Sequence, residues 1–262
     1  MDFKLKLRQS LRQMYDAAAR QPLGLLGGVS PARGIALLEE LGYATEDLQP
    51  LPDFQIGTSF PCGNPLPVIR NLQPSVVFDL GCGSGLDLCI LAGDRQLNPA
   101  LLGLDLSWEL LSLARRAREL LQLATTIQLV HADFSHLPYH HAFIDLISMN
   151  GSFNIIVDKA SFFHDIASLL VPGGHLLIHD LLLVGDLPAG FADEVTNWSW
   201  NIGGAISDGE LLRLATKASL SLVHLYKREL VEPVCRGEIL LQKGTNSSSK
   251  MVPPGNRWQR QQ

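Results

Sequence analysis

The chain has 262 residues, 46% of them hydrophobic, which allows one large domain with a sizeable buried core. Its 21 Lys and Arg against 26 Asp and Glu give a formal net charge of -5. This balance argues against a dedicated nucleic-acid binder, which normally carries a basic face. No apolar run approaches the ~18 residues that span a bilayer, because acids such as Asp79 and Asp180 interrupt the candidates. We therefore expect neither a nucleic-acid nor a membrane partner.

The four cysteines, Cys62, Cys82, Cys89 and Cys235, form no C-x-x-C pair. Two of them fall in one predicted turn and helix, which makes a disulfide framework a poor explanation and favours a reducing compartment. The basic N-terminus is not followed by a long apolar segment with a small-residue cleavage site, so no signal peptide is indicated. The sequence predicts a cytoplasmic protein.

In residues 1–20, apolar side chains recur at a helical spacing with basic residues between them, which predicts an amphipathic helix packed on the domain. Residues 21–74 are rich in Gly and Pro around one short helical segment at 31–41. We expect residues 1–70 to form an N-terminal helical cap or lid.

From Ser75 onward, short apolar runs alternate with helical segments. Near-continuous apolar strands in such an alternation predict a parallel sheet that is covered on both faces. Two final β-like runs are joined by a linker too short for a parallel crossover, so they should pair antiparallel. The expected strands are 75–80, 101–105, 126–131, 143–150, 175–183, 220–230 and 237–242, and the expected helices are 86–95, 108–121, 160–170 and 208–218. This α/β domain spans 71–243, and the polar stretch 244–262 should be a disordered tail.

A glycine-rich turn, Gly81-Cys82-Gly83-Ser84-Gly85, joins the first of these strands to a helix. Glycines let the backbone approach a ligand closely, and ligands of open parallel sheets bind beyond the carboxyl ends of the strands. The dinucleotide fingerprint G-x-G-x-x-G/A needs Gly or Ala at 86, where this chain has Leu86. Asp79 also stands two residues before the first glycine. A carboxylate there repels a pyrophosphate but suits the sulfonium and amino groups of S-adenosylmethionine, the cofactor that we predict.

Two further acids stand at strand ends. Asp105 ends the second strand, where a carboxylate can accept hydrogen bonds from both ribose hydroxyls. Asp133 follows the third strand and can accept from an adenine amine, while Phe134 lies against the ring. The predicted cofactor-binding residues are Asp79, Gly81, Cys82, Gly83, Gly85, Asp105, Leu106, Asp133, Phe134 and Asn150.

With these acids in order, 71–243 resembles a class I S-adenosylmethionine-dependent methyltransferase, and the segment 170–175 (Leu-Val-Pro-Gly-Gly-His) resembles another signature of that class. The resemblance implies a Rossmann-like sheet of seven strands, mostly parallel, with an antiparallel last strand.

Segments outside this core resemble the arsenite methyltransferase branch: Leu41-Gly42-Tyr43, Cys62-Gly63-Asn64-Pro65, Val157-Asp158-Lys159 and Gly203-Gly204-Ala205. Members of that branch bind trivalent arsenic through cysteine thiolates. Cys62 matches one such cysteine, whereas the other two positions fall on Gly151 and Asn201, which supply no thiolate. Because a soft metalloid favours several sulfur ligands, we infer that the cofactor half is retained and that the substrate has changed.

The substrate side is less constrained, because methyl transfer mainly needs an oriented nucleophile and a general base only for some acceptors. Our catalytic candidates are Cys62, Asn150, Asp180 and Asn201. Trp198 and Trp200 could wall an organic acceptor or serve as packing residues, and we expect His179 to be a packing residue of its strand.

The Asn/Asp/Ser-Pro-Pro-Tyr/Phe motif of methyltransferases that act on bases and glutamine is absent, and Asn150-Gly151-Ser152-Phe153 takes its place. With the acidic charge balance, this favours a small-molecule acceptor. We predict methyl transfer to such an acceptor by a monomer or weak dimer, with no metal. Arsenite methylation, nicotinamide-dependent oxidoreduction and S-adenosylmethionine binding without catalysis are the alternatives.

Overall fold

The computed structural model describes residues 2–20, 34–123, 127–134, 136–139 and 141–245. Seven strands form one sheet in the order β3-β2-β1-β4-β5-β7-β6. The strands are β1 (Val76–Leu80), β2 (Ala100–Asp105), β3 (Ile127–His131), β4 (Ile144–Asn150), β5 (Leu170–Leu183), β6 (Leu220–Val231) and β7 (Val234–Lys243). β1 to β5 pair in parallel, and β7 lies antiparallel between β5 and β6. The predicted Rossmann-like sheet with an antiparallel last strand is confirmed.

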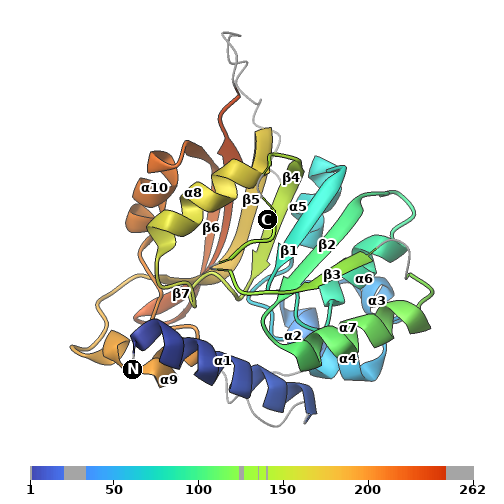
Figure 1. Cartoon of the computed structure of the whole chain (residues 1–262), viewed down its shortest axis with the longest axis horizontal. Coiled ribbons are helices and arrows are strands. Elements are labelled where there is room, and N and C mark those ends of the chain that lie inside the picture. The colour runs from blue at the N-terminus through green and yellow to red at the C-terminus, as the bar shows by residue number, and fades with distance from the viewer. Residues whose placement is uncertain (1, 21–33, 124–126, 135, 140, 246–262) are drawn as a thin grey trace.

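Helices pack on the sheet and across the strand ends (Figure 1). α6 (Leu86–Gly93) and α7 (Trp108–Leu120) pack beside β2 and β3, and α8 (Lys159–Leu169) and α10 (Asp208–Lys217) beside β5 and β6. Side-chain oxygens of Ser107, Asp158 and Ser207 accept backbone N–H bonds at the starts of α7, α8 and α10, where helix donors lack partners. These caps follow the serine and aspartate placement that the sequence shows.

The segment before the sheet is more helical than the sequence suggested. Besides α2 (Ile35–Glu40), it contains α3 (Thr45–Leu48), α4 (Asp53–Gly57) and α5 (Leu66–Leu72), so the expectation of one short helix was wrong. Pro52 and Pro65 stand at the starts of α4 and α5, where a missing N–H costs nothing, so a Pro-rich composition is compatible with these helices. The predicted boundary between 70 and 71 falls inside α5.

Other boundaries shift in small ways. β5 begins at Leu170, which pairs with Ile144, and the register with β4 shifts before His175 pairs with Leu146. The turn between β6 and β7 is two residues, Glu232 and Pro233. A short 3-10 helix (Phe191–Asp193) and α9 (Val195–Ser199) precede α10, so Trp198 lies in a helix. The predicted tail lies, from residue 246 onward, outside the described residues, as do 31–33 of the predicted helix 31–41.

The predicted N-terminal helix is α1 (Phe3–Arg20), which crosses the end of the sheet where β1 to β4 finish (Figure 1). Its Leu7, Leu11 and Ala18 are buried, as the helical spacing predicts. Within the described ranges, no helix is both long and apolar enough to cross a membrane. α1 thus packs across the carboxyl end of the sheet with its apolar side chains buried.

Candidate functional site

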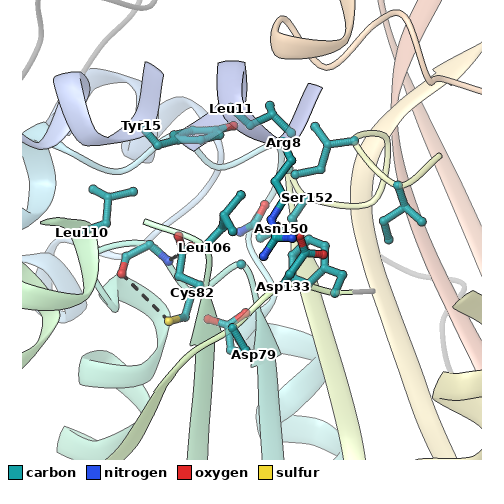
Figure 2. Close-up of a pocket in the computed structure, with 18 of the residues that line it drawn as sticks. Arg8, Leu11, Tyr15, Asp79, Cys82, Leu106, Leu110, Asp133, Asn150 and Ser152 are labelled. Carbon is teal, nitrogen blue, oxygen red and sulfur yellow. Dashed lines mark hydrogen bonds and ion pairs between the residues drawn. The ribbon is translucent and has the colours of Figure 1, made fainter. Parts of the chain in front are cut away.

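A cavity of about 540 Å³ lies between α1 and the carboxyl ends of β1 to β4 (Figure 2). Parallel strands of this kind carry their ligand sites at that edge. Nine of the ten predicted cofactor residues line the cavity: Asp79, Gly81, Cys82, Gly83, Asp105, Leu106, Asp133, Phe134 and Asn150. The tenth, Gly85, stands at the start of α6, outside the lining.

The glycine turn has the backbone geometry that requires glycine. Gly81 and Gly83 have φ angles of 84° and 55°, in the left-handed region that side chains with a Cβ disfavour. A Cβ on Gly81 would come within 2.6 Å of the Cβ of Ser152. The turn thus brings bare backbone up to the cavity floor.

Three acids surround the floor of the cavity, and two of them, Asp79 and Asp105, were expected there from the sequence. Asp79, Asp87 and Asp105 are each no more than 9% exposed. Burial, followed by the nearby charges of Asp87 and Asp105, holds the pKa of Asp79 well above its usual range. Burial also raises the pKa of Asp105, although N–H groups of Ser107 and Gly83 donate to its carboxylate, each at 2.8 Å. Crowded, desolvated carboxylates of this kind are stabilised by a cation.

Asp87 was not expected at the site, since nothing in its position at the second residue of α6 indicates a ligand-binding role. Tyr43 Oη donates to Asp87 Oδ1 at 2.7 Å, and Asn150 Nδ2 donates to Asp87 Oδ2 at 3.2 Å. Burial raises the pKa of Asp87, and these hydrogen bonds oppose the rise. Asp87 therefore links Tyr43 in the N-terminal segment to Asn150 at the end of β4 through hydrogen bonds.

Asn150 is the hub of this connection. Its Oδ1 accepts from the backbone N–H groups of Cys62 and Gly63, at 2.8 and 3.1 Å. Its Nδ2 donates to the carbonyl oxygen of Gly63 at 2.9 Å, in addition to Asp87. Asn150 thus fixes the 62–63 loop behind the cavity wall.

α1 closes the cavity from above through polar contacts with cofactor-site residues. Arg8 Nε lies 2.9 Å from Asp133 Oδ2, and Ser107 Oγ donates to Asp16 Oδ1 at 2.6 Å. Figure 2 shows Arg8 and Tyr15 on α1 above Asp133 and Asp79. The pKa of Tyr15 is raised by burial and then by the charge of Asp105. The sequence predicted α1 but gave no sign that Arg8 reaches the acid expected at the adenine.

The remaining catalytic candidates gather behind the lining of the cavity. Cys62 Sγ lies 4.0 Å from Asp180 Oδ1 and 3.8 Å from Asn201 Nδ2, and Asn201 Nδ2 also donates to Asp180. None of the three lines the cavity, but Gly151 does, and a Cβ on Gly151 would lie 3.3 Å from Cys62 Sγ. The three positions related to arsenic ligands are therefore neighbours, with Cys62 the thiol among them.

The cluster keeps its sulfur neutral. Burial, reinforced by the Asp180 charge, raises the pKa of Cys62 far above its usual range. Burial raises the pKa of Asp180 to about 6, although the N–H groups of Phe153 and Asn154 donate to its carboxylate. A protonated thiol is a poor metal ligand. Within the residues that the structure describes, no group of three or more His, Cys, Asp or Glu side chains is arranged to hold a metal ion.

The tryptophans and His179 also lie away from the lining of the cavity. Trp198 donates its indole N–H to the carbonyl oxygen of Ala192 at 2.7 Å and contacts Phe3 edge-on. His179 is 2% exposed and bonds Glu238 through Nε2 at 3.0 Å. These contacts fit the packing interpretation of Trp198 and His179.

Comparison with known proteins places this geometry among methyltransferases. A family model described as a methyltransferase domain matches residues 73–219. An arsenite methyltransferase of Halobacterium salinarum is 24% identical over 192 residues, which cover 73% of this chain and 48% of that protein. An O-methyltransferase of Pyrenophora dematioidea is 25% identical over 201 residues, covering 74% and 73%. The chain thus spans about half the length of the arsenite enzyme that it matches.

Solved structures of similar fold include an arsenic(III) S-adenosylmethionine methyltransferase from Chlamydomonas reinhardtii. Its TM-score is 0.59 at 21% identity, with 82% of this chain and 75% of that chain covered. A geranyl diphosphate C-methyltransferase from Streptomyces coelicolor A3(2) gives 0.61 at 12% identity, with 90% and 97% covered. That structure holds Mg²⁺, geranyl diphosphate and S-adenosyl-L-homocysteine. Because both sequence identities are low, the similarity to these two structures shows a shared fold and nothing about the acceptor.

Proposed function

The chain belongs to the methyltransferase-domain family and uses S-adenosylmethionine, and we propose that it methylates a small organic molecule held beneath α1. The observation that carries the proposal is the ring of buried acids on the cavity floor. Asp79, Asp87 and Asp105 crowd three buried carboxyl groups at the end of the sheet, where burial and the neighbouring acids disfavour the charged form of Asp79 and raise its pKa. A cationic ligand relieves that repulsion, whereas a pyrophosphate would increase it.

We assign roles to the residues from their places in the cavity. Asp105 accepts from the ribose hydroxyls, Asp133 from the adenine amine, and Asp79 faces the cationic end of the cofactor. Leu106 and Phe134 provide apolar surface for the adenine ring. Asn150 holds the 62–63 loop beside the transfer site. Asp180 and Asn201 act through Cys62 as positioning residues behind the wall.

S-adenosylmethionine supplies an electrophilic methyl carbon; the acceptor's lone pair forms the new bond, and the carbon–sulfur pair stays on sulfur. The protein orients the acceptor and excludes water. Where the acceptor carries a proton, the proton leaves to water or a nearby carboxylate as the bond forms.

Calorimetry with S-adenosylmethionine and S-adenosylhomocysteine tests cofactor binding, and a screen of thiol, phenol and amine acceptors tests turnover. Asp105→Ala should weaken both ligands, because both carry the ribose. The control is Glu119→Gln, at an exposed position of α7 outside the cavity lining. If wild-type protein binds neither ligand, the proposal fails. Binding without turnover on any acceptor supports the non-catalytic alternative.

Arsenite is a second candidate acceptor, favoured by the similarity to arsenite methyltransferases and by the clustering of Cys62, Gly151 and Asn201. One buried, neutral thiol beside an amide and a glycine is a poor trap for a soft metalloid, which is why we rank it second. Turnover of As(III) with glutathione that disappears in Cys62→Ser would reverse that order.

A cytoplasmic location, a monomer or weak dimer, and the absence of nucleic-acid and membrane partners stay predictions. Gel filtration and light scattering of the purified chain test the oligomeric state.

A further inference from the structure

The cavity extends beyond the cofactor acids, and there its wall is apolar. Leu7 and Leu11 of α1 face it and are at most 4% exposed. Ile156 and Phe162, before and within α8, are at most 9% exposed on the same lining. Phe60 and Ile155 complete this part of the wall. We call these six residues the apolar chamber.

The charged side chains of this part of the lining stand at its rim. Lys4, Asp158 and Asp165 are exposed. Asp158 is also engaged in capping α8, since it accepts from the Ser161 N–H at 3.0 Å. Arg8 is paired with Asp133 at 2.9 Å. A charged acceptor inside the chamber would therefore lose water without meeting a buried counter-charge from these groups.

Two apolar side chains mark an entrance. Leu5 on α1 is 44% exposed, and Val157 before α8 is 38% exposed, yet both line the cavity. Single exposed apolar residues are ordinary on a protein surface. These two belong to the same cavity as the buried chamber, so apolar surface continues from solvent to the interior.

We propose that the acceptor is an uncharged, largely apolar organic molecule that enters between Leu5 and Val157 and binds its apolar part in the chamber. The proposal rests on the function proposed above and names the acceptor class. Its nucleophilic atom points toward the ends of β1 and β4, where Asp79 and Asn150 line the cavity.

The test uses 4-alkylphenols, from methyl to pentyl, titrated into the full chain by calorimetry with and without S-adenosylhomocysteine. Each methylene that enters an apolar chamber should lower the dissociation constant about fourfold. A dissociation constant that does not change with alkyl length overturns the proposal. So does tighter binding of alkyl phosphates than of the matching phenols.

Two substitutions at exposed positions test where the alkyl group enters the cavity. Val157→Asp places a charge at the entrance and should weaken pentylphenol at least tenfold while leaving the S-adenosylhomocysteine affinity unchanged. Val184→Asp is the matched control, because Val184 is 49% exposed and outside the cavity lining. Equal affinities of the two variants for pentylphenol would overturn the proposed entrance.

The two proposals fail separately in these experiments. If wild-type protein does not bind S-adenosylhomocysteine, the cofactor assignment is refuted. The alkyl series measured without that ligand still tests the apolar chamber. Cofactor binding together with a flat alkyl series refutes the chamber alone.

Discussion

Replacing Asp79 by asparagine should weaken S-adenosylmethionine binding and at the same time stabilise the ligand-free protein. Asp79 is 5% exposed, so solvent screens its charge little. A charge-assisted contact is worth roughly 1.5–3 kcal/mol, which corresponds to about a 10- to 150-fold weaker affinity. Because Asp79 is well desolvated, we expect the upper half of this range.

The stabilising effect follows from the raised pKa of Asp79, caused by burial and then by Asp87 and Asp105. Between the unfolded pKa and the raised folded pKa, the folded state binds more protons than the unfolded state, so stability falls as pH rises. Asp79→Asn removes this loss. The ligand-free variant should therefore melt above the wild type at pH 8, and the difference should shrink toward pH 4.

The assay combines calorimetric titration at pH 8 with thermal unfolding of the ligand-free proteins at pH 4 and 8, and Glu119→Gln serves as the control. Comparing the two ligands separates the contacts, since a loss with S-adenosylmethionine alone indicates the sulfonium and an equal loss with S-adenosylhomocysteine indicates the amino group. An Asp79→Asn variant that binds within threefold of the wild type would refute the electrostatic reasoning.

Three further changes test other parts of the site. Arg8→Gln removes the guanidinium from Asp133, so the association of S-adenosylmethionine measured by stopped flow should become faster. The free energy of unfolding should change by less than about 1 kcal/mol, because Arg8 is half exposed. Slower association would mean that Arg8 helps to hold the cofactor. Gly151→Ala should cost about 1–2 kcal/mol in urea unfolding, since Gly151 has a φ of 77°, and an unchanged midpoint would argue against this backbone geometry. Iodoacetamide should alkylate Cys62 slowly at pH 8, because burial and Asp180 raise its pKa, and mass spectrometry that finds rapid modification would contradict a neutral thiol.

The sequence predicted which of the proposed cofactor residues lie together, because the signals are local. Asp79 and the turn through Gly85 are contiguous, Asp105 ends β2, and Asp133 follows the end of β3 by two residues. In a parallel sheet, consecutive strand ends meet at one edge, so the pattern alone brings these residues together. Nine of the ten residues indeed line one cavity.

Contacts between distant segments were harder to predict from the sequence, because these residues meet only in the tertiary structure. Arg8 and Asp133 are far apart in the sequence, and Asp87 gains its partners Tyr43 and Asn150 from other segments. Helical periodicity predicted that Leu7 and Leu11 are buried but not against what. Cys62, Asp180 and Asn201 were expected at the substrate side, yet none of the three lines the cavity, whereas Phe60, Pro61 and Gly151 do.

α1 carries both the contacts to the cofactor side and the wall of the acceptor side, which implies an order of binding. Arg8 Nε lies 2.9 Å from Asp133 Oδ2, so we expect an adenine ring that bonds Asp133 to displace Arg8 and to shift this part of α1. Leu7 and Leu11 lie on the same turns, so an acceptor packed against them would oppose that shift. We therefore expect the cofactor to bind first. In steady-state assays, S-adenosylhomocysteine should inhibit competitively against S-adenosylmethionine, and the methylated product should inhibit non-competitively against the acceptor. Competitive inhibition by the methylated product against the acceptor would indicate a random order and would mean that the adenine reaches Asp133 without movement of α1.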